Sequence, residues 1–141
     1  MFCRYSGDFM KQRKSTEDYL KAIYIISKKS EVHAVQIAER LGLTRPTVSV
    51  SLKTLEKEGY ITIDTEHIIR LTPMGESLAR EMYERHITFR SLLLGLGIDE
   101  KTADRDACEI EHAVSAKSYT AFKNLAVSLA QNQEDFNNDD K

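Results

Sequence analysis

The chain has 141 residues, of which 41% are hydrophobic and 30% charged, with a formal net charge of −2. This length permits one hydrophobic core or two small ones. No apolar stretch is long enough to cross a membrane, residues 1–14 lack the apolar segment of a signal peptide, and Cys3 and Cys108 are too isolated for a disulfide framework, so we expect a cytoplasmic protein without a membrane partner.

The charges are unevenly distributed along the chain. Residues 1–72 carry 12 Lys and Arg against 9 Asp and Glu, whereas residues 73–141 carry 8 against 13. A basic first half and an acidic second half indicate contact with a polyanion by the first and cation binding by the second. Ordinary solvated surfaces also produce a split of this size.

The first part of the chain predicts three helices. Residues 1–14 have no hydrophobic period and several basic side chains, and we expect a flexible basic arm. Ser15 is placed to cap a helix that continues to about residue 29. A short helix at 35–41 ends at a glycine, and a third helix at 44–58 has proline in its first turn.

The hydrophobic period then changes. Two short β-branched runs, 60–63 and 68–71, are separated by four polar residues and predict a small hairpin. We expect three further helices, which begin at Pro73, Asp99 and Ser115, and a disordered acidic tail at residues 131–141.

Helix, short helix, turn, helix and hairpin is the order of a winged helix-turn-helix. Ala38, Gly42 and Val48 have the spacing of two helices that cross closely through a tight turn. A generic helical hairpin is the alternative. We predict a mainly α protein with a winged helix-turn-helix DNA-binding domain at 15–72 and an all-helical domain at 73–130. Its predicted wedge of packed side chains comprises Ile37, Leu41, Val48, Leu52 and Leu55.

The third helix is the predicted recognition helix. With Val48 pointing inward, its opposite side and its N-terminal end face outward at 100° per residue. Such helices read bases mainly from the N-terminal end. The predicted base contacts are Arg45, Pro46, Thr47, Ser49 and Val50, and the predicted backbone contacts are Lys53, Lys57 and the wing residue Arg70. Any one of them alone could be an ordinary solvated side chain.

Cys108, Glu111 and His112 recur at i, i+3 and i+4, which places them on one face of a helix. Thiolate, carboxylate and imidazole are ligands of divalent transition metals. The alternative is an exposed face that happens to carry these residue types. Two further candidate ligands, Asp18 and His86, lie on other predicted helices. Asp18 alone could stabilise its helix N-terminus, and His86 alone could be an imidazole at the edge of the core.

These features resemble the diphtheria-toxin-repressor and manganese-transport-regulator family of metal-dependent bacterial repressors. The resemblance covers about residues 15–130, and its segments are Ser15–Tyr24, Ile37–Leu41, Pro46–Ser49, Leu71–Gly75, Arg85–His86 and Cys108–His112. It implies a homodimer whose second domain, 73–130, supplies both the dimer interface and the metal site, and no SH3-like third domain. It also implies Fe²⁺ or Mn²⁺ as corepressor and operators in front of metal-uptake genes.

The resemblance assigns the candidate ligands to two branches of the family. Cys108, Glu111 and His112 match the iron-type Cys-x-x-Glu-His motif. Asp18 matches the manganese-type residue, where iron-type members have methionine, and His86 matches a histidine of both branches.

Two positions depart from both patterns. Lys21 stands where the manganese branch has a second carboxylate, and Arg90 stands where the iron branch has glutamate. A cation at either position opposes a second metal, and Asp104, at the position of an iron-type histidine, is the residue available to compensate. We therefore expect one well-formed site.

The sequence predicts a metal-dependent transcriptional repressor, not an enzyme, which binds palindromic double-stranded operator DNA as a homodimer and takes no small organic substrate. The soft Cys108 would accept iron, cobalt, nickel or zinc, whereas the carboxylates of Asp18 and Glu111 suit manganese or iron, so iron satisfies both tendencies. Zinc, cobalt or nickel could also bind in vitro. A metal-independent or thiol-sensing winged-helix regulator is the main alternative. A zinc hydrolase is a remote one, because no spare general base is evident.

Overall fold

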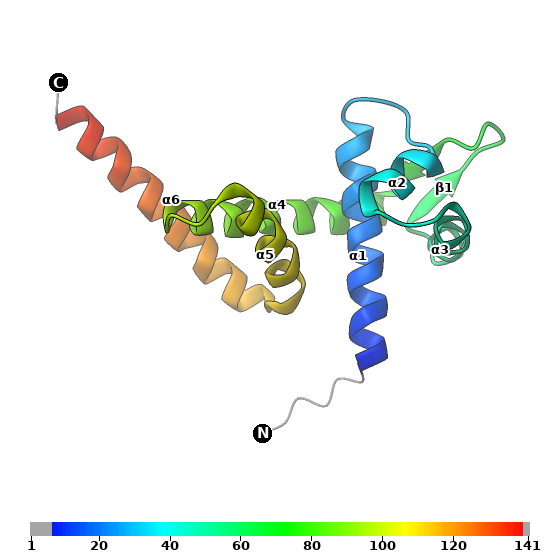
Figure 1. Cartoon of the computed structure of the whole chain (residues 1–141), viewed down its shortest axis with the longest axis horizontal. Helices are drawn as coiled ribbons and strands as arrows, with labels where there is room; N and C mark the ends of the chain where they lie inside the picture. The colour runs from blue at the N-terminus through cyan, green and yellow to red at the C-terminus, as the bar shows by residue number, and fades with distance from the viewer. Residues whose placement is uncertain (1–6, 140–141) are drawn as a thin grey trace. The chain divides into compact units, whose positions relative to one another are not determined.

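The computed structural model describes residues 7–139, with side chains described for residues 13–133. The chain forms two compact units, which divide between Met82 and Tyr83. The described residues form six helices and one two-stranded hairpin, which confirms the mainly α fold class (Figure 1). None of these helices combines the length and the apolarity that a membrane span requires.

Helix α1 spans Gly7–Ser27, so the prediction that a helix begins at Ser15 is wrong. Residues 8–14 contain neither proline nor glycine, and nothing in them stops a helix. The Nε atom of Arg13 lies 3.0 Å from Oε1 of Glu17, one turn later, and this pair supports the helix across the predicted boundary. The predicted arm at 1–14 is therefore helical from Gly7, and residues 1–6 lie outside the described residues.

Helix α2 (Ala34–Leu41) and helix α3 (Arg45–Lys57) form the predicted helix-turn-helix. Gly42 ends α2 in the left-handed region, with φ of 65°, which glycine adopts without steric cost. The hydroxyl of Thr44 accepts a hydrogen bond from the backbone N–H of Thr47 at 3.4 Å, which confirms the predicted N-cap.

The core of the first unit lies between these helices. Ile37, Val48, Leu52 and Leu55 are buried, and Leu41 packs against them, which confirms the predicted wedge. The residues of α1 that complete this core are Tyr19, Leu20 and Ile23.

Strands β1 (Ile61–Ile63) and β2 (Ile69–Leu71) form the predicted hairpin, with Thr62 paired to Arg70. The backbone N–H of Ile69 also donates to the carbonyl of Val32 at 2.9 Å, so the segment before α2 lies along the hairpin. The wing is thereby joined to the helices through its buried edge.

Helix α4 (Pro73–Gly95) begins directly after the hairpin and continues across the division between the units. The predicted domain boundary at residue 72 is the beginning of this helix, whereas the compact units divide within it. A Cβ atom at Gly75 would lie 2.0 Å from the carbonyl oxygen of Tyr60, so only glycine permits this close approach of helix and hairpin. Thr72 supports the same junction, since its hydroxyl donates to the Gly59 carbonyl at 2.7 Å.

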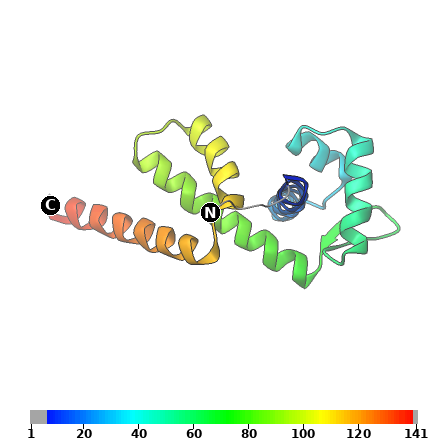
Figure 2. The same ribbon diagram turned by 90° about the horizontal axis from the view of Figure 1, so that it is seen from below.

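The second unit also contains helices α5 (Glu100–Ala113) and α6 (Ala116–Asp139), and α5 lies beside α4 in both views (Figures 1 and 2). Asp99 caps α5 by accepting from the N–H of Thr102 at 3.0 Å, as predicted. The predicted disordered tail at 131–141 differs from the structure, in which α6 continues to Asp139. Residues 131–139 contain no helix-breaking glycine or proline.

A small aromatic cluster holds the second unit together. Phe89 of α4 lies against Tyr119 and Phe122 of α6, with ring centroids 6.2 and 5.3 Å apart. The Tyr119 hydroxyl lies 3.2 Å from that of Thr88. The cluster includes the buried Ala107 of α5, so it fixes α5 against the middle of α4.

Candidate metal centre and DNA-reading surface

Glu111 is the centre of a polar cluster in the second unit. Its side chain is fully buried. One carboxylate oxygen, Oε2, lies 3.0 Å from Nδ1 of His86, and the other, Oε1, lies 3.3 Å from Nε2 of His112. The carboxylate therefore lies between two imidazoles, one from α4 and one from α5.

Cys108 adds a sulfur atom to this cluster. Its Sγ atom lies 3.7 Å from Nδ1 of His86, and the residue is only partly exposed. One potential ligand atom from each of His86, Cys108 and Glu111 lies within 4.8 Å of the others. The helical spacing of Cys108 and Glu111 puts both side chains one turn apart on the face of α5 toward α4.

The donor set fits a divalent transition metal. It offers an imidazole nitrogen, a thiol sulfur and a carboxylate oxygen within one ion's reach, with a second imidazole on the same carboxylate. A buried carboxylate is costly unless a cation or hydrogen bonds compensate its charge. His86, Cys108, Glu111 and His112 can thus hold the predicted ion.

Asp18, the fifth predicted ligand, is a partly buried residue of α1 in the first unit. The second unit brings the other four predicted ligands together without it, and the place of Asp18 in the ligand set stays a prediction. Lys21 is also on α1 and is buried.

Arg90 and Asp104 form an ion pair beside the cluster. The Nε atom of Arg90 lies 2.5 Å from Oδ1 of Asp104, and the same oxygen lies 3.9 Å from Nε2 of His86. One carboxylate oxygen of Asp104 therefore faces both the Arg90 guanidinium and the Nε2 edge of the His86 ring.

Arg85 is a buried residue to which the sequence analysis gave no role. Its Nη1 atom donates to the carbonyl oxygens of Glu111, at 3.2 Å, and Val114. Its guanidinium carbon lies 5.0 Å from the centroid of the Tyr119 ring. Arg85 falls in the apolar stripe of α4, between Met82 and Phe89. A charged residue within such a stripe indicates a buried side chain with polar partners, and this pattern could have identified Arg85 from the sequence.

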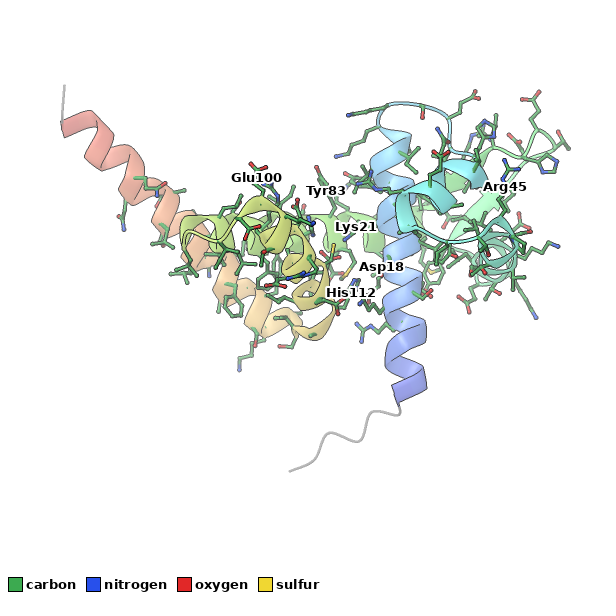
Figure 3. The ribbon with its side chains drawn as sticks, in the orientation of Figure 1. Asp18, Lys21, Arg45, Tyr83, Glu100 and His112 are labelled. Atoms are coloured by element: carbon green, nitrogen blue, oxygen red, sulfur yellow. The ribbon has the colours of Figure 1, made fainter. Side chains whose placement is uncertain are left out.

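The outer face of α3 carries the predicted DNA contacts. Its exposed residues include Val50, whose side chain is 68% accessible, and Arg45 at the N-terminal end of the helix (Figure 3). Pro46, Thr47, Ser49 and Lys53 are exposed as well. All the predicted base-reading side chains are thus available to a partner in the described chain, and their contacts with DNA stay predictions.

The wing residue Arg70 is exposed but engaged. Its Nη1 atom lies 2.6 Å from Oδ2 of Asp64, and the carboxylate of Asp64 also accepts from the backbone N–H groups of Glu66 and Ile68. The hydrogen bond from Arg70 is the main reason why the pKa of Asp64 lies below its ordinary value, with the backbone bonds adding to it. Arg70 is therefore held in place by the turn of the hairpin.

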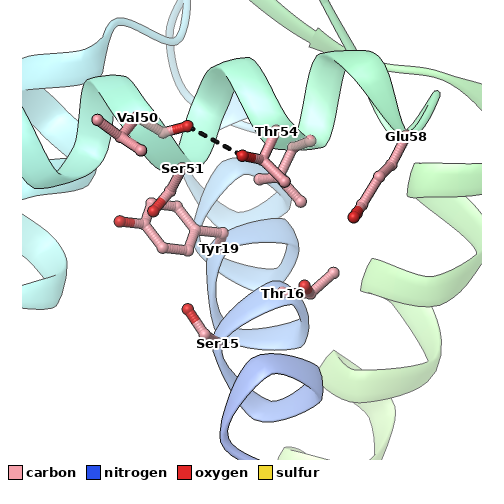
Figure 4. A pocket seen from close by; sticks show the side chains of 8 residues that line it. Ser15, Thr16, Tyr19, Val50, Ser51, Thr54 and Glu58 are labelled. Atoms are coloured by element: carbon pink, nitrogen blue, oxygen red, sulfur yellow. Dashed lines mark hydrogen bonds between the residues drawn. The ribbon is translucent and has the colours of Figure 1, made fainter. Parts of the chain in front are cut away.

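A hollow of about 380 Å³ lies between α1 and α3 (Figure 4). Hydroxyl groups of both helices line it, among them those of Ser15, Ser51 and Thr54, and the Thr54 hydroxyl donates to the Val50 carbonyl at 3.2 Å. The hydroxyl of Tyr19 is buried beside the hollow and has no hydrogen-bond partner among the described residues. No local sequence pattern predicts this hollow, because it depends on the packing of two helices far apart in the chain.

Comparison with known proteins identifies both halves of the chain. Residues 11–68 match the family model of the iron-dependent repressor N-terminal DNA-binding domain, and residues 72–134 match that of the iron-dependent repressor metal-binding and dimerisation domain. The chain is 39% identical over 112 residues to the transcriptional regulator MntR of Salmonella typhimurium, which covers 79% of this chain and 71% of the relative. It is 31% identical over 103 residues to the diphtheria toxin repressor of Corynebacterium diphtheriae, covering 72% and 46%.

The fold is also shared with solved structures. A manganese-dependent transcriptional repressor in complex with manganese aligns with a TM-score of 0.71 at 28% identity, and the match covers 79% of this chain and 52% of that one. The chain thus spans about half the length of the solved protein that it matches. With both family models matched in order and a relative above 30% identity, the chain belongs to the diphtheria-toxin-repressor and manganese-transport-regulator family of metal-dependent, DNA-binding transcriptional repressors, which are not enzymes.

Proposed function

We propose that this protein is a cytoplasmic repressor of metal-uptake genes, which binds palindromic operator DNA as a homodimer when it holds Fe²⁺ or Mn²⁺. The observation that supports it most is the buried carboxylate of Glu111 between the imidazoles of His86 and His112, with Cys108 beside them. The same chain carries an exposed recognition helix.

His86, Cys108, Glu111 and His112 hold the ion in this proposal, and Asp18 of α1 joins them by its match to the manganese branch. The bound ion supplies two positive charges to the buried carboxylate of Glu111. Because α1 packs in the core of the DNA-binding unit, a ligand on α1 would restrict the position of α3. Metal binding and operator binding are then coupled reciprocally.

The dimer in this proposal forms through the second unit. Its core of buried side chains is small, and apolar residues of α4 and α6 remain exposed. Leu125 and Leu129 of α6 are about half accessible, and Leu96 after α4 is 78% accessible. Small units with exposed apolar side chains commonly complete their core by association. Two recognition helices in one dimer match the two half-sites of a palindrome.

Operator binding by the purified protein tests this proposal. DNA selected from a random library by the metal-loaded protein would be titrated anaerobically with Fe²⁺, Mn²⁺, Co²⁺, Ni²⁺ and Zn²⁺, with a chelator control. We expect chelation to weaken binding at least tenfold and light scattering to give a dimer. Affinity that does not change on chelation would refute metal control.

A thiol-sensing regulator is the second candidate function, because Cys108 lies 3.7 Å from an imidazole nitrogen that could stabilise its thiolate. Titration with peroxide in the presence of chelator distinguishes the two. Under the metal-dependent proposal, oxidant lowers DNA affinity only when metal is present, because it removes a ligand. An oxidant response in chelator supports the thiol sensor instead.

A further inference from the structure

The ring of His86 lies between two carboxylates of α5. Its Nδ1 atom is 3.0 Å from Oε2 of Glu111, and its Nε2 atom is 3.9 Å from Oδ1 of Asp104. Asp104 and Glu111 are two turns apart along α5, so they face opposite edges of one imidazole. The two ring nitrogens therefore have different surroundings.

The Nδ1 side of the ring carries the better metal ligands. The Cys108 thiol and the buried Glu111 carboxylate both lie on this side. A histidine that binds a metal through one nitrogen usually donates its other N–H group to a carboxylate, which orients the ring. Asp104 is the carboxylate on the Nε2 side. The separation of 3.9 Å is too long for a direct hydrogen bond, and a small rotation of Asp104 or a bridging water would complete one.

Arg90 forms an ion pair with Asp104 and thereby limits the ability of this carboxylate to bind a metal ion. Its Nε atom lies 2.5 Å from the same Oδ1 atom that faces His86. A guanidinium that pairs with this carboxylate compensates its charge and engages the oxygen atom that a second divalent ion would otherwise bind. The side chains of Arg90 and Asp104 are both accessible to solvent, so a metal ion could reach Asp104 from solution if Arg90 were absent.

We propose that Arg90 is a fixed internal cation that takes the place of a second metal, so that each subunit holds one divalent ion on the Nδ1 side of His86. In this arrangement Asp104 is a positioning residue that orients the His86 ring. The inference rests on the proposed metal binding by His86 and Glu111, and it goes further by setting the number of ions and the nitrogen that binds.

Arg90→Glu tests the number of ions. This substitution removes the cation and puts a carboxylate beside Asp104 and the Nε2 atom of His86, which makes three potential ligands. Binding of Mn²⁺ alone would be followed by the electron paramagnetic resonance signal of the free ion. We expect one Mn²⁺ per wild-type chain and two per Arg90→Glu chain. The matched control is Arg105→Glu, the same charge change on an exposed residue of α5, which should keep one ion.

Asp104→Asn tests the positioning role. We expect Co²⁺ affinity to fall by about tenfold or more, the usual effect of removing such a carboxylate. The thiolate-to-cobalt absorption band from Cys108 should persist, because no ligand is lost. Circular dichroism and urea unfolding would verify that each variant is folded, and a folded Asp104→Asn protein with wild-type affinity would refute the positioning role.

The stoichiometry separates this inference from the proposed function. Two ions on the wild-type chain, or one ion on folded Arg90→Glu, would overturn the inference about Arg90 and leave metal-dependent repression standing. If the wild-type chain binds no Mn²⁺, Fe²⁺ or Co²⁺, the proposed function and this inference both fail.

Discussion

The Nδ1 atom of His86 on α4 lies 3.0 Å from Oε2 of Glu111 on α5, although 25 positions separate the two residues. This polar contact between two candidate metal ligands joins α4 and α5, in addition to the apolar packing between the helices. It also places a buried carboxylate where its charge needs compensation.

Glu111→Gln should abolish metal-dependent operator binding. The amide keeps the shape of the side chain but removes the negative charge that attracts the ion, so we expect metal affinity to fall at least a hundredfold. Calorimetric metal titration and gel shift measure the two effects. Glu109→Gln, an exposed residue on the same helix, is the control and should behave like wild type. Full repression by Glu111→Gln would contradict the assignment.

Lys53→Ala should weaken DNA binding equally for all sequences. Lys53 is exposed on α3, and we expect it to contact a phosphate group of the DNA backbone, so its replacement removes one charged contact with the DNA. We expect the slope of log affinity against log salt to decrease by about 1. Fluorescence anisotropy at several salt concentrations measures it. Lys101→Ala, on an exposed residue of α5, should leave the slope unchanged.

Arg70→Ala should raise the pKa of Asp64 toward its ordinary value of 3.8, because the hydrogen bond from Arg70 is the largest cause of its lowering. Because the pKa of Asp64 is lower in the folded state, its ionised carboxylate stabilises the protein at pH values above the unfolded-state pKa. This stabilisation disappears as the pH falls through the folded-state pKa. The variant should therefore lose less hairpin stability on acidification. Carbon-detected nuclear magnetic resonance of the Asp64 carboxyl group measures this change in pKa. Arg80→Ala, whose partners are Tyr24 and Glu76, should not shift the pKa of Asp64.

Arg85→Met should destabilise the second unit. The substitution keeps much of the apolar stem but leaves the buried carbonyl of Glu111 without its donor. We expect the free energy of unfolding to fall by about 2–4 kcal/mol. Urea denaturation measures this change. Arg105→Met removes an exposed ion pair with Asp106 and should cost less than about 0.5 kcal/mol. Equal costs for the two variants would show that Arg85 does not hold α5.

Tyr19→Phe should not destabilise the protein, whereas Tyr119→Phe should. The Tyr19 hydroxyl is buried with no hydrogen-bond partner among the described residues, so its removal should leave stability unchanged or raise it by up to about 1 kcal/mol. The Tyr119 hydroxyl bonds to Thr88, and its removal should cost about 0.5–1.5 kcal/mol. Thermal and urea unfolding measure both. A loss for Tyr19→Phe would reveal a partner such as an ordered water in the hollow beside α3.

Local features of this chain were predictable because their determinants lie within a few residues. Thr44 and Asp99 cap the helices that follow them, since a side-chain oxygen reaches an N–H group three residues later. The spacing of Cys108, Glu111 and His112 defines one helix face regardless of the rest of the fold. By the same logic, the hydrophobic spacing from Ile37 to Leu55 identified the core of the helix-turn-helix.

The sequence by itself thus determined the order of the elements, the core pattern and the ligand types on α5. Only the tertiary structure decided which distant residues meet those ligands: His86 at Glu111, Arg85 at the end of α5, and Arg90 at Asp104. The physical reason is that helical spacing determines only short-range neighbours, whereas contacts between helices depend on the packing of whole faces.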